Sequence, residues 1–296
     1  MKKILWGVCA LFVGLAFSTT ASAQLKFAVL AQRGVDTAIK EFEPLMEYLS
    51  AQMGEKITLV PLKFTEIQDW WQVNPDGVML TNPWFYVRAK VTRGAKALVT
   101  VNYVGSKGYM SGVIFTKKDS GIQSLQDLRG KVVMVPKLSS PGGWLFQKGE
   151  IVKAGIVPER DFKLLLETPD ESHDQVVYAV RDGKADAGTV RTNLLEAMHR
   201  EGKINMNDFL VLNPMHHEGF AYVCSTPLYP DWPVFSMKDT PPAKAERLKK
   251  VLLSIPAGHP VLEKARNIEN FIDALDYRPM EELCKLLGVQ PFQTKK

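Results

Sequence analysis

From residue 25 onward, short apolar runs alternate with longer segments in which apolar residues recur at helical spacing. The short runs predict buried strands, because a strand that is covered on both faces is apolar throughout. The predicted strands cover residues 25–30, 57–62, 77–80, 97–104, 112–116, 132–135, 186–190, 209–212 and 220–224. Strands that alternate with helices along most of a chain indicate an α/β fold.

The segments between these strands carry start and stop signals of helices. Asn82 before Pro83 predicts one N-cap, Ser172 predicts another, and Gly94 predicts a helix end. The predicted helices cover residues 36–53, 83–93, 144–154, 174–181, 192–200, 243–253, 262–274 and 280–287. We expect Pro44 to kink the first of them.

Two expectations concern single apolar side chains. Ile39 shares the apolar face of the helix at 36–53 and should be buried. Trp70 and Trp71 are adjacent on a short predicted helix, so they cannot share one face. We therefore expect at least one of these tryptophans to be exposed or to lie at an interface.

The first 23 residues have the pattern of a secretory signal peptide. Lys2 and Lys3 precede an apolar core at 4–17, and the small residues 21–23 precede Gln24. We expect cleavage after Ala23 and a mature protein that is exported to the periplasm. The alternative reading of this segment is an N-terminal membrane anchor.

The charge is mildly basic. The formal net charge is +5, and Lys2 and Lys3 supply two of these charges, which leaves a value compatible with an anionic ligand. It is far below what nucleic-acid binding needs, so we expect no nucleic-acid partner. Cys224 and Cys284 remain after cleavage, and an oxidising compartment leaves a disulfide between them open.

The candidate chemistry lies where strands lead into helices. Ser139 and Ser140 precede Pro141 after a buried strand, and Ser172 with His173 opens a later helix. Ligands of open α/β sheets bind beyond the carboxyl ends of the strands, and helix N-termini attract anions. The sequence therefore predicts a binding site for a small oxyanion.

Each of these residues has a simpler interpretation. The serines could cap a helix, His173 could be solvated, and Arg33 and Arg191 could be partners in structural ion pairs. The aromatics are by default core residues, with one or two at the cleft; they are Trp84, Tyr86, Tyr103 and Trp144.

A metal site or an active site has weaker support. His216, His217 and Glu218 suggest a metal-binding protein, but their spacing does not match that of zinc-protease helices. The chain has no Gly-x-Ser-x-Gly elbow, no phosphate loop and no paired-cysteine motif. We therefore expect neither an enzyme nor a cofactor.

Several motifs resemble those of a known family. They are the run at 124–131, the pair Ser139–Ser140, the segment 172–180 and Asp186-Ala187-Gly188. They resemble the phosphonate-binding (PhnD-like) periplasmic solute-binding proteins. The resemblance implies a type II periplasmic-binding-protein fold, in which two α/β lobes joined by a two-strand hinge close on a ligand.

The glycine-rich piece at 105–108 and the polar segment at 213–218 are the predicted crossings between lobes. Lobe 1 is then residues 24–108 plus 216–296, and lobe 2 is residues 109–215. Residues 30–34, 186–192 and 228–233 are also similar to the sensing domain of tetrathionate-type sensor kinases. We expect a free-standing binding protein with that type of pocket.

The resemblance also implies site residues and partners. It places ligand-binding hydroxyls at Ser139 and Ser140 and a cleft histidine at His173. The family's acidic position for an aminoalkyl group falls on Asn193, which argues against an aminoalkylphosphonate, whereas Arg191 suits an oxyanion. The candidate ligand-binding residues are Arg33, Asn82, Tyr86, Ser139, Ser140, His173, Arg191 and Asn193.

The expected partner is a membrane ABC permease that receives the ligand, and we expect the protein to be a monomer. The alternative is a signalling role, in which the closed form docks onto a membrane sensor kinase.

Overall fold

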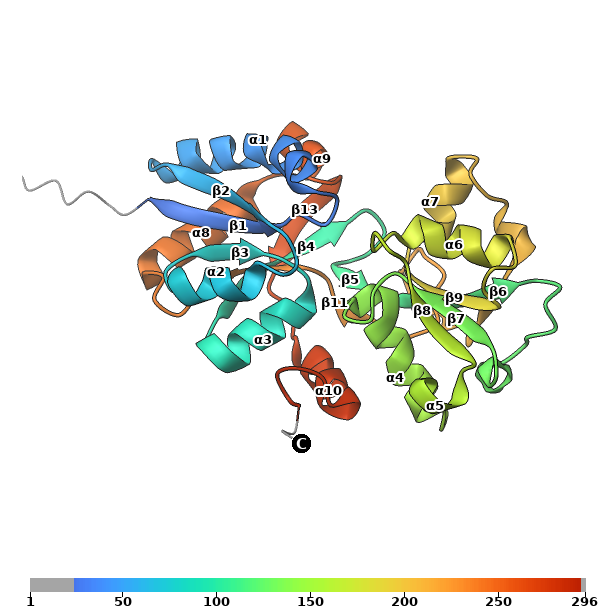
Figure 1. Cartoon of the computed structure of the whole chain (residues 1–296). Helices are drawn as coiled ribbons and strands as arrows, with labels where there is room; N and C mark the ends of the chain where they lie inside the picture. The colour runs from blue at the N-terminus through green and yellow to red at the C-terminus, as the bar shows by residue number, and fades with distance from the viewer. Residues whose placement is uncertain (1–23, 294–296) are drawn as a thin grey trace, which may run out of the picture.

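The computed structural model describes residues 24–293 and consists of two α/β lobes, each built around its own sheet (Figure 1). The predicted signal peptide at 1–23 lies outside the described residues. Within residues 24–293, no helix is both long and apolar enough to cross a membrane. The fold class predicted from the sequence is confirmed.

The larger lobe contains a six-stranded sheet in the order β13-β4-β12-β3-β1-β2. Its strands are β1 (Leu25–Leu30), β2 (Ile57–Leu62), β3 (Val78–Leu80), β4 (Lys96–Tyr103), β12 (Pro233–Ser236) and β13 (Ile268–Asp273). β1 pairs in parallel with β2 and β3, whereas β12 and β13 run antiparallel to β4. The carboxyl ends of the parallel strands therefore share one edge.

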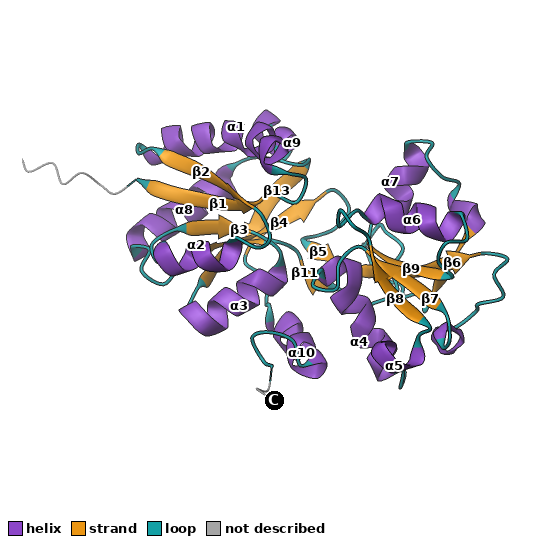
Figure 2. Ribbon diagram, viewed as in Figure 1, coloured by secondary structure: helices purple, strands orange, loops and turns teal. Residues whose placement is uncertain are grey.

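Helices cover the two faces of this sheet (Figure 2). They are α1 (Val35–Met53), α2 (Ile67–Val73), α3 (Pro83–Arg93), α8 (Pro242–Ser254) and α9 (Pro260–Lys264), with α10 (Arg278–Leu287) at the end of the chain. α1 is one continuous helix with Pro44 inside it. Ile39 is 41% exposed, so its predicted burial was wrong; the buried face runs through Ala38, Phe42 and Leu45.

The smaller lobe contains a five-stranded sheet in the order β10-β6-β9-β7-β8. Its strands are β6 (Gly112–Lys117), β7 (Val132–Val135), β8 (Leu164–Glu167), β9 (Ala187–Arg191) and β10 (Phe209–Leu212). Its helices are α4 (Phe146–Lys153), α5 (Pro158–Asp161), α6 (His173–Arg181) and α7 (Leu194–Arg200). A π-helical turn, Pro141–Leu145, leads directly into α4.

A short antiparallel pair of strands connects the lobes. β5 (Tyr109–Met110) pairs with β11 (Tyr229–Pro230), and both strands lie between the two sheets (Figure 1). The segment before β11 stays with the smaller lobe, because the Ser225 hydroxyl donates to the Leu212 carbonyl at 2.7 Å. The chain therefore returns to the larger lobe at β11, later than the predicted crossing at 213–218.

Two predicted elements in the C-terminal third were wrong. Residues 220–224 form no strand; Cys224 makes one isolated bridge with Met215. The helix predicted at 262–274 ends early, because Arg266 and Asn267 take positive φ values, and β13 follows. Apolar residues at both helical and strand spacing made this segment ambiguous.

Trp70 and Trp71 are both buried, at 8% and 3% exposure, which contradicts the expectation that one would be exposed. The Trp70 ring packs where a Cβ of Gly77 would stand, and the Trp71 ring meets Phe85 at 6.1 Å between centroids. Because different neighbours cover the two faces of the short helix α2, adjacent tryptophans are both removed from solvent.

Candidate functional site

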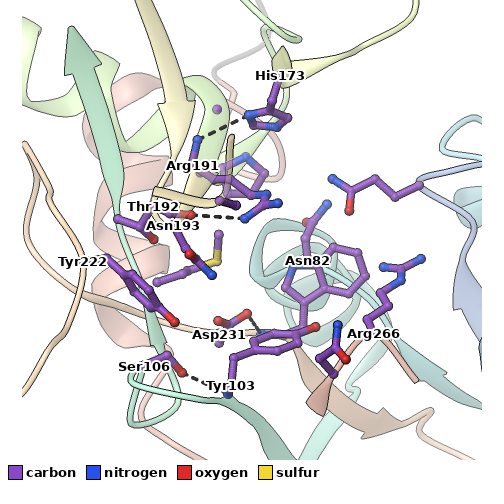
Figure 3. Close-up of a pocket in the computed structure, with 18 of the residues that line it drawn as sticks. Asn82, Tyr103, Ser106, His173, Arg191, Thr192, Asn193, Tyr222, Asp231 and Arg266 are labelled. Carbon is purple, nitrogen blue, oxygen red and sulfur yellow. Dashed lines mark hydrogen bonds between the residues drawn. The ribbon is translucent and has the colours of Figure 1, made fainter. Parts of the chain in front are cut away.

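A cavity of about 600 Å³ lies between the lobes, and side chains from both lobes and from the strands that join them line it (Figure 3). The larger lobe contributes Arg33, Asn82 and Arg266, and the smaller lobe contributes His173 and Arg191. This volume is in the usual range for small-molecule sites.

Several helix starts converge on this cavity. Its lining includes Arg33 just before α1, Asn82 at the start of α3, Ser140 at the π-helical turn, His173 at the start of α6 and Asn193 just before α7. The first amides of a helix have no partner within that helix, and the helix dipole makes this end positive. Their convergence makes the cavity suited to a negatively charged ligand.

Asn82 fixes the start of α3. Its side-chain oxygen accepts a hydrogen bond from the Phe85 amide at 3.1 Å, and Pro83 takes the first helical position. Asn82 is 5% exposed, so the cap is formed inside the protein where the helix meets the cavity. The cap predicted from the sequence is confirmed.

The π-helical turn is held close to the opposite strand. The Ser140 hydroxyl accepts from the Gly143 amide at 3.2 Å. A Cβ on Gly142 would lie 3.2 Å from the Arg191 Cβ, and a Cβ on Gly143 would lie 3.0 Å from the His173 ring. A Cβ on Gly143 would also lie 2.4 Å from the Pro136 ring, so the turn needs glycine at this position to approach its neighbours so closely.

His173 is a neutral hydrogen-bonding residue in this site. Its Nδ1 accepts from the Arg191 amide at 3.3 Å, so the ring proton is on Nε2. Burial, and then the nearby Arg191 guanidinium, lower the pKa of His173 to about 3. At neutral pH it therefore offers an N–H donor and no charge.

Arg191 ends β9 inside the cavity. Its Nη1 donates to the Thr192 carbonyl at 3.1 Å, and among residues 24–293 no carboxylate forms an ion pair with it. Burial lowers the pKa of the guanidinium. A partly buried guanidinium without an ion-pair partner is well suited to donate hydrogen bonds to a bound oxyanion and to balance its charge.

The other arginines of the cavity differ in how far they are neutralised. Arg33 is exposed and has no ion-pair partner within the described part of the chain. Arg200 donates to the Asn193 side chain at 3.3 Å. Arg266 pairs with Glu41 at 2.7 Å, so it contributes less to the field. Two carboxyl groups, those of Glu201 and Asp231, also line the cavity, so the four arginines leave it with an excess of positive charge.

Asp231 was missed by sequence reasoning. It follows β11, is 6% exposed, and accepts from the Trp232 amide at 2.8 Å. Burial raises the pKa of its carboxyl to about 6, and the Trp232 amide and Arg191 oppose that rise. Asp231 also brings a carboxylate into the cavity. A ligand that carries an ammonium group could pair with it, although Asn193 stands where the family has an acidic residue.

The aromatic lining was only partly predicted. Tyr103 lines the cavity, as expected for one of the candidate aromatics, and burial raises the pKa of its hydroxyl. Tyr109, Tyr222 and Trp232 line it as well. The motif at 228–233 pointed to the Asp231–Trp232 segment, but no local pattern showed that this segment enters the cleft.

The candidate residues that line the cavity are Arg33, Asn82, Ser140, His173, Arg191 and Asn193. Tyr86 and Ser139 are not part of the lining. Tyr86 is a core residue: its ring meets Tyr277 at 4.8 Å between centroids and its hydroxyl accepts from the Ala97 amide at 3.2 Å. Of the serine pair, only Ser140 lines this cavity.

The metal and disulfide alternatives find no support in residues 24–293. No group of three or more metal-ligating side chains occurs in that range, and His216 and His217 are not part of the cavity lining. His217 Nε2 instead lies 3.2 Å from the Thr226 carbonyl. Cys224 and Cys284 are both free and buried.

A cleft between two α/β lobes that are joined by a pair of strands defines a two-lobed solute-binding protein. The model of the family described as "ABC transporter, phosphonate, periplasmic substrate-binding protein" matches residues 27–277, so the chain belongs to that family. The resemblance drawn from the motifs is confirmed. The family is described as one of periplasmic substrate-binding proteins.

Two known relatives are similar to this chain over part of their own length. The chain is 32% identical over 258 residues to the tetrathionate sensor histidine kinase TtrS of Salmonella typhimurium, covering 83% of this chain and 42% of the kinase. It is 27% identical over 162 residues to the phosphate-import protein PhnD of Mycolicibacterium smegmatis, covering 50% and 48%. The chain thus spans less than half the length of either.

Solved structures share the fold. PhnD1 from Prochlorococcus marinus in complex with methylphosphonate has a TM-score of 0.70 at 18% identity, covering 89% of this chain and 98% of that one. XAC2383 from Xanthomonas citri bound to ATP also has a TM-score of 0.70, at 20% identity, covering 92% and 98%. At these identities the likeness concerns the fold alone.

Proposed function

We propose that this protein binds a small oxyanion in the cleft between its lobes. The observation that carries the proposal is the convergence of several helix starts with Arg191, which has no ion-pair partner in residues 24–293, on one cavity. The amides, the Ser140 hydroxyl and the His173 Nε2 proton would contact the oxygens, and Arg191 would balance the charge. Lobe closure would remove water and strengthen these contacts.

The proposed ligand is an oxyanion of phosphorus or sulfur. Family membership and the relatives named for phosphate and methylphosphonate favour phosphorus. The higher identity to a tetrathionate sensor favours sulfur. Asp231 bears on the choice, because a protonated oxyanion could donate a hydrogen bond to its carboxylate and a fully ionised one could not.

The proposed partner is an ABC permease, to which the protein would deliver its ligand in the periplasm as a monomer. A second candidate is a sensory role, which the match to the sensor kinase supports over 83% of the chain. Uptake of a labelled ligand would be lost on deletion of the gene in the first case. In the second, uptake would persist and the transcriptional response to the ligand would be lost.

A thermal-shift screen tests the binding function directly. The panel holds phosphate, phosphite, methylphosphonate, 2-aminoethylphosphonate, sulfate, thiosulfate and tetrathionate, with zinc chloride as a separate arm. A ligand at a hundred times its Kd stabilises the folded protein by about 2.7 kcal/mol. We expect at least one oxyanion to raise the melting temperature. A shift with zinc alone, or with none of these ions, would contradict the proposal.

A further inference from the structure

Gln147 lies behind the cleft and does not line it. It is on α4 and is fully buried, with 0% exposure. Its Nε2 donates to the Gly142 carbonyl at 2.7 Å and to the Val190 carbonyl at 2.8 Å. One side-chain amide thus connects the π-helical turn to the last residue before Arg191.

A second hydroxyl holds the same turn. The Thr189 hydroxyl donates to the Gly143 carbonyl at 2.5 Å. Consecutive carbonyls of the turn therefore each receive a side-chain donor, and both connections lead to β9. The turn is π-helical, because the Leu145 amide donates to the Ser140 carbonyl at 2.9 Å. Such turns are rare in proteins overall, but those that occur are often found at functional sites.

The surroundings of Gln147 indicate that the side chain is needed there. A Cβ on Gly112 would lie 2.3 Å from the Gln147 Nε2, so β6 carries a glycine where the amide stands. The Gln147 Oε1 is buried and has no hydrogen-bond partner in the described residues. An apolar side chain of the same length would avoid that unsatisfied oxygen, so the amide is kept at an energetic cost.

We propose that Gln147 is a positioning residue of the binding site, which fixes the Gly142 amide of the turn at 141–145 relative to the Arg191 guanidinium. Two donated hydrogen bonds set that spacing: one to the turn, one to the strand that carries Arg191. This proposal rests on the binding function proposed above. An oxyanion that contacts both groups would then bind weakly when the spacing is lost, although no contact to the ligand is removed.

The test uses Gln147→Leu and Gln147→Glu in the full protein, with binding measured by calorimetry for whichever oxyanion of the panel binds the wild type. We expect Gln147→Leu to weaken binding about tenfold or more. In Gln147→Glu the ionised carboxylate cannot donate to either carbonyl, whereas the protonated form can donate to one. Its affinity should therefore recover, relative to the wild type, as the pH is lowered.

The affinity of the wild type is measured over the same pH range as a reference. This is needed because His173, Arg191 and Asp231 line the same cavity, and Asp231 ionises at about pH 6, within that range. Thr116→Val is the matched control. It removes a buried hydroxyl that donates to the Asp186 carbonyl at 2.6 Å, just before the other end of β9. We expect this control to lower the melting temperature and leave Kd unchanged.

A ligand-independent readout separates the two proposals. The ¹H–¹⁵N resonances of Gly142 and Gly143 should move in Gln147→Leu and not in Thr116→Val. If the wild type binds no oxyanion but these resonances move, the binding function fails and the positioning of the turn stands. Wild-type affinity in Gln147→Leu, or unmoved glycine resonances, would overturn the positioning role.

Discussion

The two walls of the cleft are built differently. The wall from the smaller lobe contains helix starts at Ser140 and His173 and, at the end of a strand, Arg191, which has no ion-pair partner in residues 24–293. Its exposed rim adds Arg200 and Glu201, and Glu201 pairs with Lys203 at 2.6 Å. The opposite wall and the strands that join the lobes carry Arg266, already paired with Glu41, and the buried Asp231.

The difference suggests a division of roles between the walls. The smaller lobe supplies donors and positive charge, so it should carry most of the affinity for any oxyanion. The other wall offers a titratable carboxyl whose charge opposes an anion, so it should decide which ligands are accepted and at which pH. Substitutions on the two walls should therefore have effects of different kinds.

The largest effect should come from Arg191→Ala. Removing the guanidinium leaves a desolvated oxyanion without its counter-charge, which we expect to weaken binding about a hundredfold or more. Calorimetry measures the Kd. Arg181→Ala is the control, because Arg181 lies on the same lobe, is exposed and pairs with Asp182. An unchanged Kd in Arg191→Ala would remove this residue from the site.

Asp231→Asn should change the pH dependence of both stability and binding. The folded state holds the Asp231 proton up to about pH 6, whereas an ordinary carboxyl loses it near 3.8, so stability falls as the pH rises between these values. Above pH 6 the substitution should stabilise the fold by about 3 kcal/mol at most. Denaturant unfolding at pH 5 and pH 8 would measure this.

Binding should respond in the same direction. The ionised Asp231 carboxylate repels an anion, so wild-type affinity should fall as the pH rises through about 6, and the Asp231→Asn variant should lack this fall. Phosphorus oxyanions that keep a proton would depart from this pattern, because they can donate to the carboxylate. A pH-independent affinity in the wild type would show that Asp231 does not face the ligand.

His173 should act on stability in the opposite sense. Its pKa is lowered to about 3 in the folded state, so the unfolded chain binds more protons between that value and about 6.5. Stability from this residue is therefore present above pH 6.5 and is lost on acidification. His173→Gln should flatten this part of the pH–stability curve while it keeps a hydrogen-bond donor. An unaltered curve would show that the imidazole is not buried.

A smaller, salt-dependent effect is expected for Arg33→Ala. Arg33 is exposed, so water and salt screen its contribution, and we expect about a threefold to tenfold loss of affinity at low salt. Lys40→Ala, an exposed cation on α1, is the control. The loss should disappear at high salt; a loss of the same size at high salt would place Arg33 in direct, desolvated contact with the ligand.

Tyr86→Phe should have the smallest effect on binding. It removes a hydroxyl that accepts from the Ala97 amide, which should cost about 1 kcal/mol of stability and leave Kd unchanged. A large change in Kd would return Tyr86 to the site, where the sequence had placed it.

Local signals account for the cavity-lining residues that the sequence predicted. Asn82, Ser140 and His173 stand at helix starts, and capping is a property of a few neighbouring residues. Asp231 and Arg266 could not be predicted in this way, because they enter the cleft through strand pairing between segments far apart in the chain. Tyr86 is a different case. It lies in the first turn of α3, whose start is at the cavity, but its side chain packs into the core and does not line the cavity.

The strands show the same difference between what local sequence patterns predict and what long-range pairing decides. β1, β2 and β7 were predicted correctly from their apolar runs, although the middle of β2 and every second residue of β7 are only partly buried. β13 was missed, since Ile268, Phe271 and Ile272 follow the i, i+3, i+4 spacing of a helix, and only pairing with β4 selects the strand.

The structure of the complex with the tightest-binding oxyanion, with the phosphorus or sulfur atom located by its anomalous scattering, tests the central claim most directly. We predict an ion whose oxygens lie within hydrogen-bond distance of the Gly142 amide and of the Arg191 guanidinium. An ion bound outside the cleft, or held within it without Arg191 and without any helix-start amide, would contradict the account.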